Sequence, residues 1–282
     1  MKKSMLIPFL VLPLLSGCSM IGIYENADKY QVGERVINYE VKRVDINWMK
    51  GIVKLIEDPE ALTFTIEESC KEDTIDELKV HSYLDENNNL SIKYGASGYM
   101  IKDLTFEKNL TITYNPLYLE SINIRVESGN IEAKTISVND ARLTIVSGYI
   151  KVENMIVRDS INVQTTSGQI YINNLLSKSI RFKTISGKIE VVSANVTSSN
   201  FESTSGDISI YGFGDLKNGA FKTISGNILL SVPTNGATIT AHMTSGDIIT
   251  DLLHKYVDGA YIFGDGGAKI DVTTTSGNLE VK

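Results

Sequence analysis

Cysteine is scarce in this sequence, with only Cys18 and Cys70 among 282 residues. Cys18 ends an export signal and is expected to carry lipid, as described below, so Cys70 has no second thiol in the same chain with which to form a disulfide. This excludes the small exported domains that disulfides hold together. Stability must come from packing of the 42% of residues that are hydrophobic.

Positive charge is also in deficit. The chain has 27 lysine and arginine residues against 34 aspartate and glutamate residues, a formal net charge of −7. Binding to nucleic acid or to anionic lipid headgroups relies on a basic surface, so neither is expected of this chain. After the first 18 residues no apolar run reaches the length of a membrane-spanning helix.

The first residues, "MKKSMLIPFLVLPLLSGC", have the layout of an export signal. Lys2 and Lys3 form the positive end, and the apolar run that follows is too short to span a bilayer. The ending Leu-Ser-Gly-Cys resembles the bacterial lipobox, which implies cleavage before Cys18 and attachment of fatty acyl chains such as palmitate. We therefore predict a signal peptide over 1–17 and a lipid attachment site with a polar tether over 18–35. The alternative is an ordinary signal peptide with a cysteine there by chance.

A lipid on Cys18 implies a membrane-anchored protein on the exported side of a bacterial cell envelope, with the membrane as its first partner. The sequence does not distinguish the inner from the outer membrane.

The second half of the chain contains eight Ser-Gly pairs, with spacings of 19, 20, 19, 19, 20, 20 and 31 residues. A constant period in this range indicates a repeat architecture. The pairs are Ser128-Gly129, Ser147-Gly148, Ser167-Gly168, Ser186-Gly187, Ser205-Gly206, Ser225-Gly226, Ser245-Gly246 and Ser276-Gly277.

Positions not used to find the repeat agree with it. The residues two after and five before each glycine are apolar in all eight copies, and the residues four before it are all polar. Each copy therefore predicts two short strands with one face inward, separated by a Ser-Gly turn at which glycine can adopt positive φ. We predict an all-β fold: a parallel β-solenoid or β-helix of about eight 19–20 residue coils over 118–282. An antiparallel meander is the alternative.

The ends of the solenoid are predicted from the flanking sequence. Residues 36–117 are expected to form an N-terminal β-rich capping region that includes an outlying rung with Gly51 at its turn. The long last spacing predicts an insertion within 254–268. The final strand, "NLEVK", is expected to be the terminal rung, where Glu280 and Lys282 discourage edge pairing. Where that fails, end-to-end self-association is expected.

Several stretches together resemble the bacterial adhesin-like family of unknown function called DUF4097. They are the signal and lipobox, the strand around Trp48, the stretch Leu110 to Pro116 and the serial "T-x-S-G-x-I-x-V" units. The resemblance implies a β-solenoid exposed at the envelope, with no catalytic or binding residues to transfer. Some members are associated with envelope-stress systems, which leaves a regulatory role open.

Enzymatic chemistry has little support in the sequence. Parallel β-helices include polysaccharide-active enzymes, whose sites need clustered carboxylates. Asp207 and Asp247 occupy the same position after their glycines, two rungs apart in sequence order and so about 10 Å apart. Turn formation is the stronger interpretation of both. We expect no catalytic residue, no resident metal and no cofactor, and Cys70 is expected to be buried. Calcium binding within the 254–271 insertion stays open.

Outward-facing aromatic residues are the candidate contact surface, for a glycan or for a protein partner that the sequence does not identify. Scattered surface aromatics are the alternative interpretation. The candidates are Tyr149, Tyr171, Tyr211, Tyr256 and Tyr261.

The functional prediction is a non-enzymatic envelope lipoprotein that displays a β-solenoid surface for adhesion or for protein or glycan interaction. The alternatives are a polysaccharide-active enzyme on the same scaffold and an envelope-stress accessory that binds a membrane partner.

Overall fold

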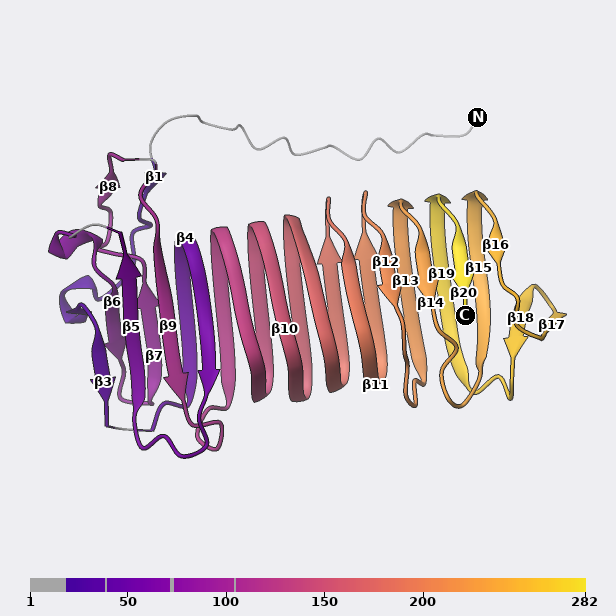
Figure 1. The fold of residues 1–282 in the computed structure, drawn as a ribbon, viewed down its shortest axis with the longest axis horizontal. Coiled ribbons are helices and arrows are strands. Elements are labelled where there is room, and N and C mark those ends of the chain that lie inside the picture. The colour runs from indigo at the N-terminus through magenta and orange to yellow at the C-terminus, as the bar shows by residue number, and fades with distance from the viewer. Residues whose placement is uncertain (1–18, 39, 72–73, 104) are drawn as a thin grey trace.

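The chain forms a long rod of stacked β-strand rungs, closed at one end by a cap (Figure 1). The computed structural model describes residues 19–38, 40–71, 74–103 and 105–282. The predicted signal peptide over 1–17 and the lipidated Cys18 lie outside the described residues. Within them, the helical elements are two single turns, η1 (Ala27–Lys29) and η2 (Asp76–Leu78).

Parallel strands build the rod. Strand β10 continues through several turns of the solenoid without a break. The rod strands are β4 (Arg43–Glu57), β10 (Ser121–Thr184), β11 (Ile189–Ser203), β12 (Ile208–Ile210), β13 (Asn218–Ser225), β14 (Ile228–Leu230), β15 (Ala237–Ser245), β16 (Ile248–Ile249), β19 (Ala268–Ser276) and β20 (Leu279–Val281).

The register places equivalent repeat positions side by side. Ile170 pairs with Ile189, and Ile189 pairs with Ile208, all three lying two residues after a repeat glycine. Gly51 of β4 pairs with Gly129 of β10 in the same way. Pairing of like with like in parallel strands confirms the predicted solenoid and excludes the antiparallel meander.

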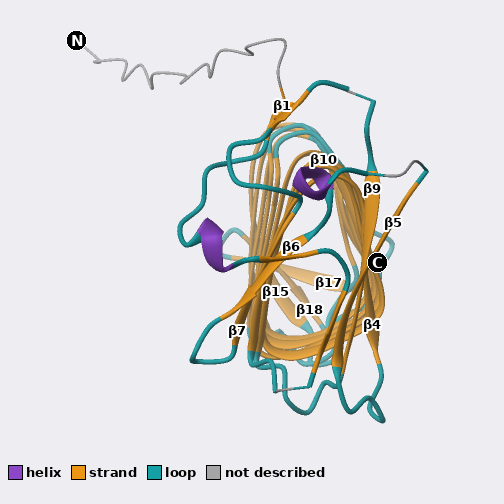
Figure 2. Cartoon of the chain, turned by 90° about the vertical axis from the view of Figure 1, so that its left-hand side faces the viewer, coloured by secondary structure: helices purple, strands orange, loops and turns teal. Residues whose placement is uncertain are grey.

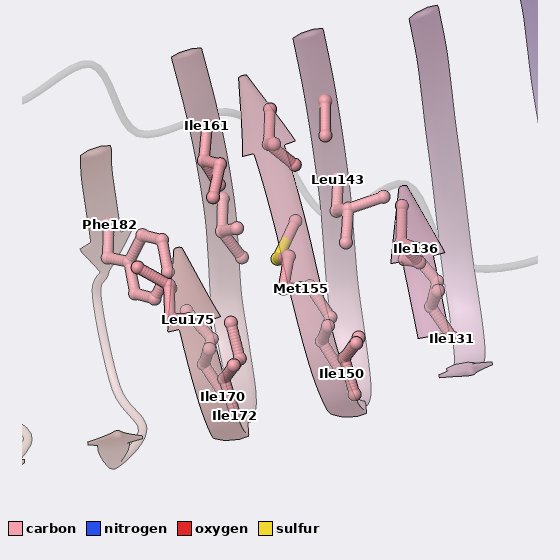
Figure 3. Packing of buried hydrophobic residues seen from close by; sticks show 14 of the residues in the cluster. Ile131, Ile136, Leu143, Ile150, Met155, Ile161, Ile170, Ile172, Leu175 and Phe182 are labelled. Atoms are coloured by element: carbon pink, nitrogen blue, oxygen red, sulfur yellow. The ribbon is translucent and has the colours of Figure 1, made fainter. Parts of the chain in front are cut away.

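The core is a set of apolar columns that run along the inside of the rod. One face of each strand points inward, as the alternation predicts, and the inward side chains stack from rung to rung (Figure 3). Phe182, Phe201 and Phe221 form one such column, with ring centroids 5.2 Å apart at each step and exposed fractions of 1% or less. Viewed along the rod, the strands enclose this interior (Figure 2).

The order of the last rungs departs from the sequence order. Strand β19 pairs with β13 on one side and with β15 on the other, and β20 lies in the same way between β14 and β16 (Figure 1). The final repeat is therefore the penultimate rung in space. The prediction that "NLEVK" forms the terminal rung was wrong: residues 237–249 form it.

The insertion forms an antiparallel hairpin of β17 (His254–Val257) and β18 (Ala260–Phe263). Strand β18 pairs antiparallel with residues Ala237 to Thr240 of β15, so the hairpin continues the sheet beyond the outermost rung. The chain then returns toward the cap end, and β19 lies between β13 and that outermost rung. We call residues 237–249 and this hairpin the distal end.

The opposite end is covered. Strands β7 and β9 pair parallel with the two halves of β4, which continues the stacking by one incomplete rung. Strands β6 and β5 then pair antiparallel with β7 and β9. We call these strands the cap: β2 (Gln31–Val32), β3 (Arg35–Ile37), β5 (Phe64–Cys70), β6 (His81–Leu84), β7 (Asn89–Lys93) and β9 (Lys108–Tyr114).

The first described residues pack on this cap. Strands β1 (Ser19–Met20) and β8 (Met100–Ile101) form a separate antiparallel pair, and Ile21 is buried. The phenol of Tyr24 donates a hydrogen bond of 3.0 Å to the carbonyl of Gly95. The segment expected as a tether thus contacts the folded cap through its own side chains.

Candidate functional site

The Ser-Gly pairs form a continuous column of glycines along one edge of the rod. A Cβ on Gly206 would overlap the carbonyl of Gly187, and the same overlap with the adjacent rung recurs at every predicted glycine. Positive φ is found at four of the eight, Gly129, Gly148, Gly246 and Gly277. Close approach of neighbouring backbones, and not the positive φ expected from the sequence, is therefore the shared reason for glycine.

Side chains that follow the glycines form a second ladder. The amide N–H of Asn227 donates to the Asp207 carboxylate (2.8 Å), that of Asn278 donates to Asn227 Oδ1 (2.9 Å), and that of Asp247 donates to Asn278 Oδ1 (2.9 Å). Asp207 thus binds a neighbouring backbone, which is a turn-stabilising role. Because the last repeat is inserted, Asp207 and Asp247 lie three rungs apart, about 14 Å, and not the expected two rungs.

Other reactive groups are dispersed. No group of three or more His, Cys, Asp or Glu side chains in the described parts of the chain is arranged to hold a metal ion. The two aspartates considered as calcium ligands in the 254–271 insertion lie in different elements: Asp265 lies outside the rod strands, whereas Asp271 lies within β19. Cys70 is exposed at the end of β5, so the prediction that it is buried was wrong. Strand β3 pairs with β5 only from Phe64 to Ile66, so the end of β5 at Cys70 has a strand on one side only.

The five candidate tyrosines occupy two separate places. Tyr149, Tyr171 and Tyr211 lie along the side of the rod, and the Tyr149 hydroxyl donates to the Glu132 carboxylate. Tyr171 is half-buried, and its neighbour in the next rung is Glu190. Tyr256 and Tyr261 lie on the distal hairpin with ring centroids 4.9 Å apart.

A groove that sequence reasoning missed crosses the rungs about half a repeat away from the glycine column. Its volume is about 660 Å³. Ile156 and Leu176 line it on successive rungs, although 45% and 47% of their surface is exposed, and Leu117 overhangs it from the loop after β9. Arg158 and Lys178 stand beside them. The signal in the sequence was an apolar residue eight positions after two successive glycines, at an outward position.

The cap contains a buried lysine that the sequence gave no reason to single out. Lys108 has a fully buried ammonium group that contacts the Glu68 carboxylate (2.8 Å) and the carbonyl of Leu78. Its Nζ lies 5.1 Å from the ring centroid of Trp48 and 4.7 Å from that of Tyr94, within the range of cation–π attraction. The Trp48 indole in turn donates to the Lys108 carbonyl (2.9 Å).

Burial lowers the pKa of Lys108 to about 8, and attraction to Glu68 opposes this shift only in part. Burial also raises the pKa of Tyr94, because the neutral phenol is favoured where water is excluded. A lysine that titrates near neutral pH is often a functional group, but this ammonium is sealed beneath aromatic side chains. The cluster therefore acts on the cap's own stability.

Asn109, next to Lys108, reproduces the turn ladder of the rod. Its side-chain oxygen accepts a hydrogen bond of 2.9 Å from the amide of Ile52, just as Asn130 accepts one of 3.1 Å from Tyr149. A Cβ on Gly51 would overlap the Lys108 carbonyl. The cap thus joins the first rung through the same contacts that join one rung to the next.

The family model of the Toastrack DUF4097 type matches residues 36–282. The chain belongs to this family. No protein of curated function matches it significantly. The match covers every rung and the cap from Val36 onward, so it describes most of the folded part. The predicted family and its β-solenoid fold are both confirmed.

Three solved structures are similar to this chain over most of its length. A "putative adhesin" from Bacteroides fragilis is similar with a TM-score of 0.50 and 12% identity, over 89% of this chain and 97% of that one. A "putative adhesin" from Parabacteroides distasonis has a TM-score of 0.46 and 12% identity, over 89% and 97%. A "putative cell adhesion protein" from Clostridium sporogenes has a TM-score of 0.32 and 10% identity, over 89% of this chain and 99% of that one. At 12% identity, the likeness to the Bacteroides fragilis protein shows the fold alone.

Among the described residues, no helix has the length and apolar character that crossing a membrane requires.

Proposed function

We propose that this protein is a non-enzymatic lipoprotein of the bacterial cell envelope, anchored through Cys18, whose solenoid side presents a contact surface to a protein or glycan. The observation that carries the proposal is the exposed groove around Ile156 and Leu176. The similar structures named as adhesins support a surface location and a role in contact.

The groove has the character of a contact site. Apolar side chains exposed together on a rigid surface favour binding, because a partner that covers them removes that surface from water. Parallel rungs hold these side chains at fixed spacing, so little ordering is needed on binding. Arg158 and Lys178 add donors at the margin, although Lys178 also contacts Asp159 at 2.6 Å.

The anchor follows from the sequence and from where the chain emerges. Residue 18 directly precedes β1, which lies at the cap end of the rod (Figure 1). A lipid on Cys18 would hold the cap nearest the membrane. The distal end, at the far end of the rod from β1, would then be the part farthest along the rod from the anchor.

Binding is tested with a glycan array and a pull-down from envelope extracts, using three versions of the chain. One is unchanged, one carries Ile156→Ser and Leu176→Ser, and one carries Tyr149→Ser and Tyr171→Ser as a matched side-wall control. The proposal expects saturable binding that the groove variant loses. Loss in the tyrosine variant alone would move the surface to those tyrosines. Equal binding by all three would contradict a side-wall site.

Anchoring is tested separately in the full chain by labelling cells with palmitate. The unchanged protein should incorporate label and sediment with membranes, and Cys18→Ser should do neither. Unlabelled protein that still sediments would contradict the lipid anchor and favour the alternative of an accessory held by a membrane partner.

A further inference from the structure

The outermost rung is covered over only half its length. Strand β18 pairs with residues Ala237 to Thr240 of β15, and within the described chain no strand pairs with the outer edge of 241–249. Ala241, Met243 and Ile248 occupy core columns whose members in the inner rungs are mostly buried, yet all three are only half-buried. The free half exposes both an unpaired strand edge and the end of the core.

The hairpin beside it carries aromatic side chains that face the core side without a core to cover. Tyr256 pairs with Tyr261 across the hairpin, and Tyr261 pairs with the buried Ile239 of β15. Paired residues point to the same face of a sheet, so the Tyr256 ring lies on the core side. It nevertheless has 63% of its surface exposed.

These two halves make a step. Over one half of the distal end, the hairpin projects two strands beyond β15, about 10 Å along the rod; the other half is recessed by the same amount (Figure 1). A half-turn about an axis perpendicular to the plane of Figure 1 brings the projecting half of one copy against the recessed half of another. Such a two-fold contact closes after two copies, because each copy contributes the same surface and none is left for a third copy.

We propose that two copies of this chain associate through their distal ends, with the hairpin of each copy covering the open half of the other. Strand β17 is parallel to β15 within one copy, because each pairs antiparallel with β18. The half-turn therefore makes β17 antiparallel to residues 241–245 of the second copy, so their free N–H and C=O groups can pair. The Tyr256 ring would then cover Met243 and Ile248 of the second copy.

Among the described residues, the outermost strands of the cap are too short to offer such an edge. Its outer strands β2 and β3 have two and three residues, and short edge strands resist further pairing. This excludes a head-to-tail fibre and favours a closed pair. The contact goes beyond the proposed side-wall function, and it requires neither the lipid nor the groove ligand.

Site-specific crosslinking in cells tests the pair with the full chain. Benzoylphenylalanine replaces Tyr256 in one version and Tyr211, an exposed side-wall residue, in the other. Irradiation should give a product of twice the mass of the mature chain for Tyr256→benzoylphenylalanine and none for the Tyr211 version. Tagged copies of two lengths should give the intermediate band that a homodimer requires. No product, or a product with a different protein or with a glycan, would overturn the proposal.

A second substitution separates contact from folding. His254 lies two residues before Tyr256 and therefore on the same face of the hairpin. His254→Asp added to the Tyr256 version should reduce the crosslinked fraction at least tenfold, and Ile156→Asp in the groove should leave it unchanged. Thermal melting should be the same for both, since both side chains are exposed. An undiminished crosslink in the His254→Asp version would contradict the proposed packing.

Discussion

The two ends of the rod differ in how completely they cover the end of the hydrophobic core. At the cap, β7 and β9 pair parallel with the first rung, antiparallel strands pair with them in turn, and Trp48 packs against Lys108, so the core columns end beneath a closed surface. At the distal end, a two-stranded hairpin covers half of the last rung and leaves Met243 and Ile248 only half-buried. An open edge on an otherwise complete solenoid marks a surface available for pairing, whereas the sealed edge serves stability.

The largest expected difference between the two ends is in the free energy of unfolding lost when an aromatic side chain is truncated to alanine. Trp48→Ala at the cap should lower the free energy of unfolding by about 3–5 kcal/mol, because it removes a buried indole and its hydrogen bond. Tyr256→Ala at the distal end should change it by less than about 0.5 kcal/mol in the monomer. Urea denaturation followed by circular dichroism measures both. Equal losses would show that the two ends are equally packed.

The buried ion pair gives the next effect. Glu68→Ala should cost about 3–5 kcal/mol, because it leaves the Lys108 ammonium buried without its counter-charge. The double variant Lys108→Met with Glu68→Gln should cost much less, since no buried charge remains. The same denaturation experiment measures this. A double variant as unstable as Glu68→Ala would mean that packing, and not charge, determines the cost.

An alanine substitution in the glycine column should destabilise the chain more than one in the turn of the distal hairpin. Gly206→Ala forces a Cβ against the Gly187 carbonyl, and we expect a loss of about 3 kcal/mol from the overpacked rung. Gly259→Ala meets no atom within 4 Å, so only its positive φ should cost, about 1 kcal/mol. Thermal melting of the two variants makes the comparison, and similar values would argue against tight stacking.

The smallest effect is a pH dependence confined to the cap. The pKa of Lys108 is lowered to about 8 in the folded chain, against the ordinary 10.5. Between these values the unfolded chain binds more protons, so the free energy of unfolding should rise with pH. The gain is about 2 kcal/mol from pH 8 to pH 10. The Lys108→Met and Glu68→Gln double variant should lack this gain, and a parallel rise in both would assign it to another group.

The repeat period and its apolar columns were enough to predict the parallel solenoid and the extra rung at Gly51. The order of the last rungs was not predictable from them, because every column accepts any rung on either side. One weak signal existed: the rung of residues 237–249 has the small Ala241 where every other rung has a larger apolar residue, and the polar Thr250 follows it in a column that is apolar in the other rungs. Weak core residues are tolerated in a rung that has a neighbour on one side only.

The buried lysine and the groove escaped prediction for a different reason. Lys108 and Glu68 are 40 positions apart, and only the antiparallel pairing of β5 with β9 brings them together. The groove depends on the loop at Leu117 folding over rungs that follow it. Both features involve the non-repeating part of the chain, where no column fixes which residues meet.

The insertion of the final repeat between its neighbours determines which rung is open, and cysteine pairs test it directly. Ser276 pairs with both Ser225 and Ser245 in the structure, whereas Ser225 and Ser245 lie two rungs apart. In a Cys70→Ser background, Ser225→Cys with Ser276→Cys and Ser245→Cys with Ser276→Cys should both oxidise to disulfides. The pair Ser225→Cys with Ser245→Cys should not, since its Cα separation of about 9.6 Å exceeds the reach of a disulfide. A disulfide in the last pair and none between 225 and 276 would mean that the rungs stack in sequence order, which would contradict the open distal edge.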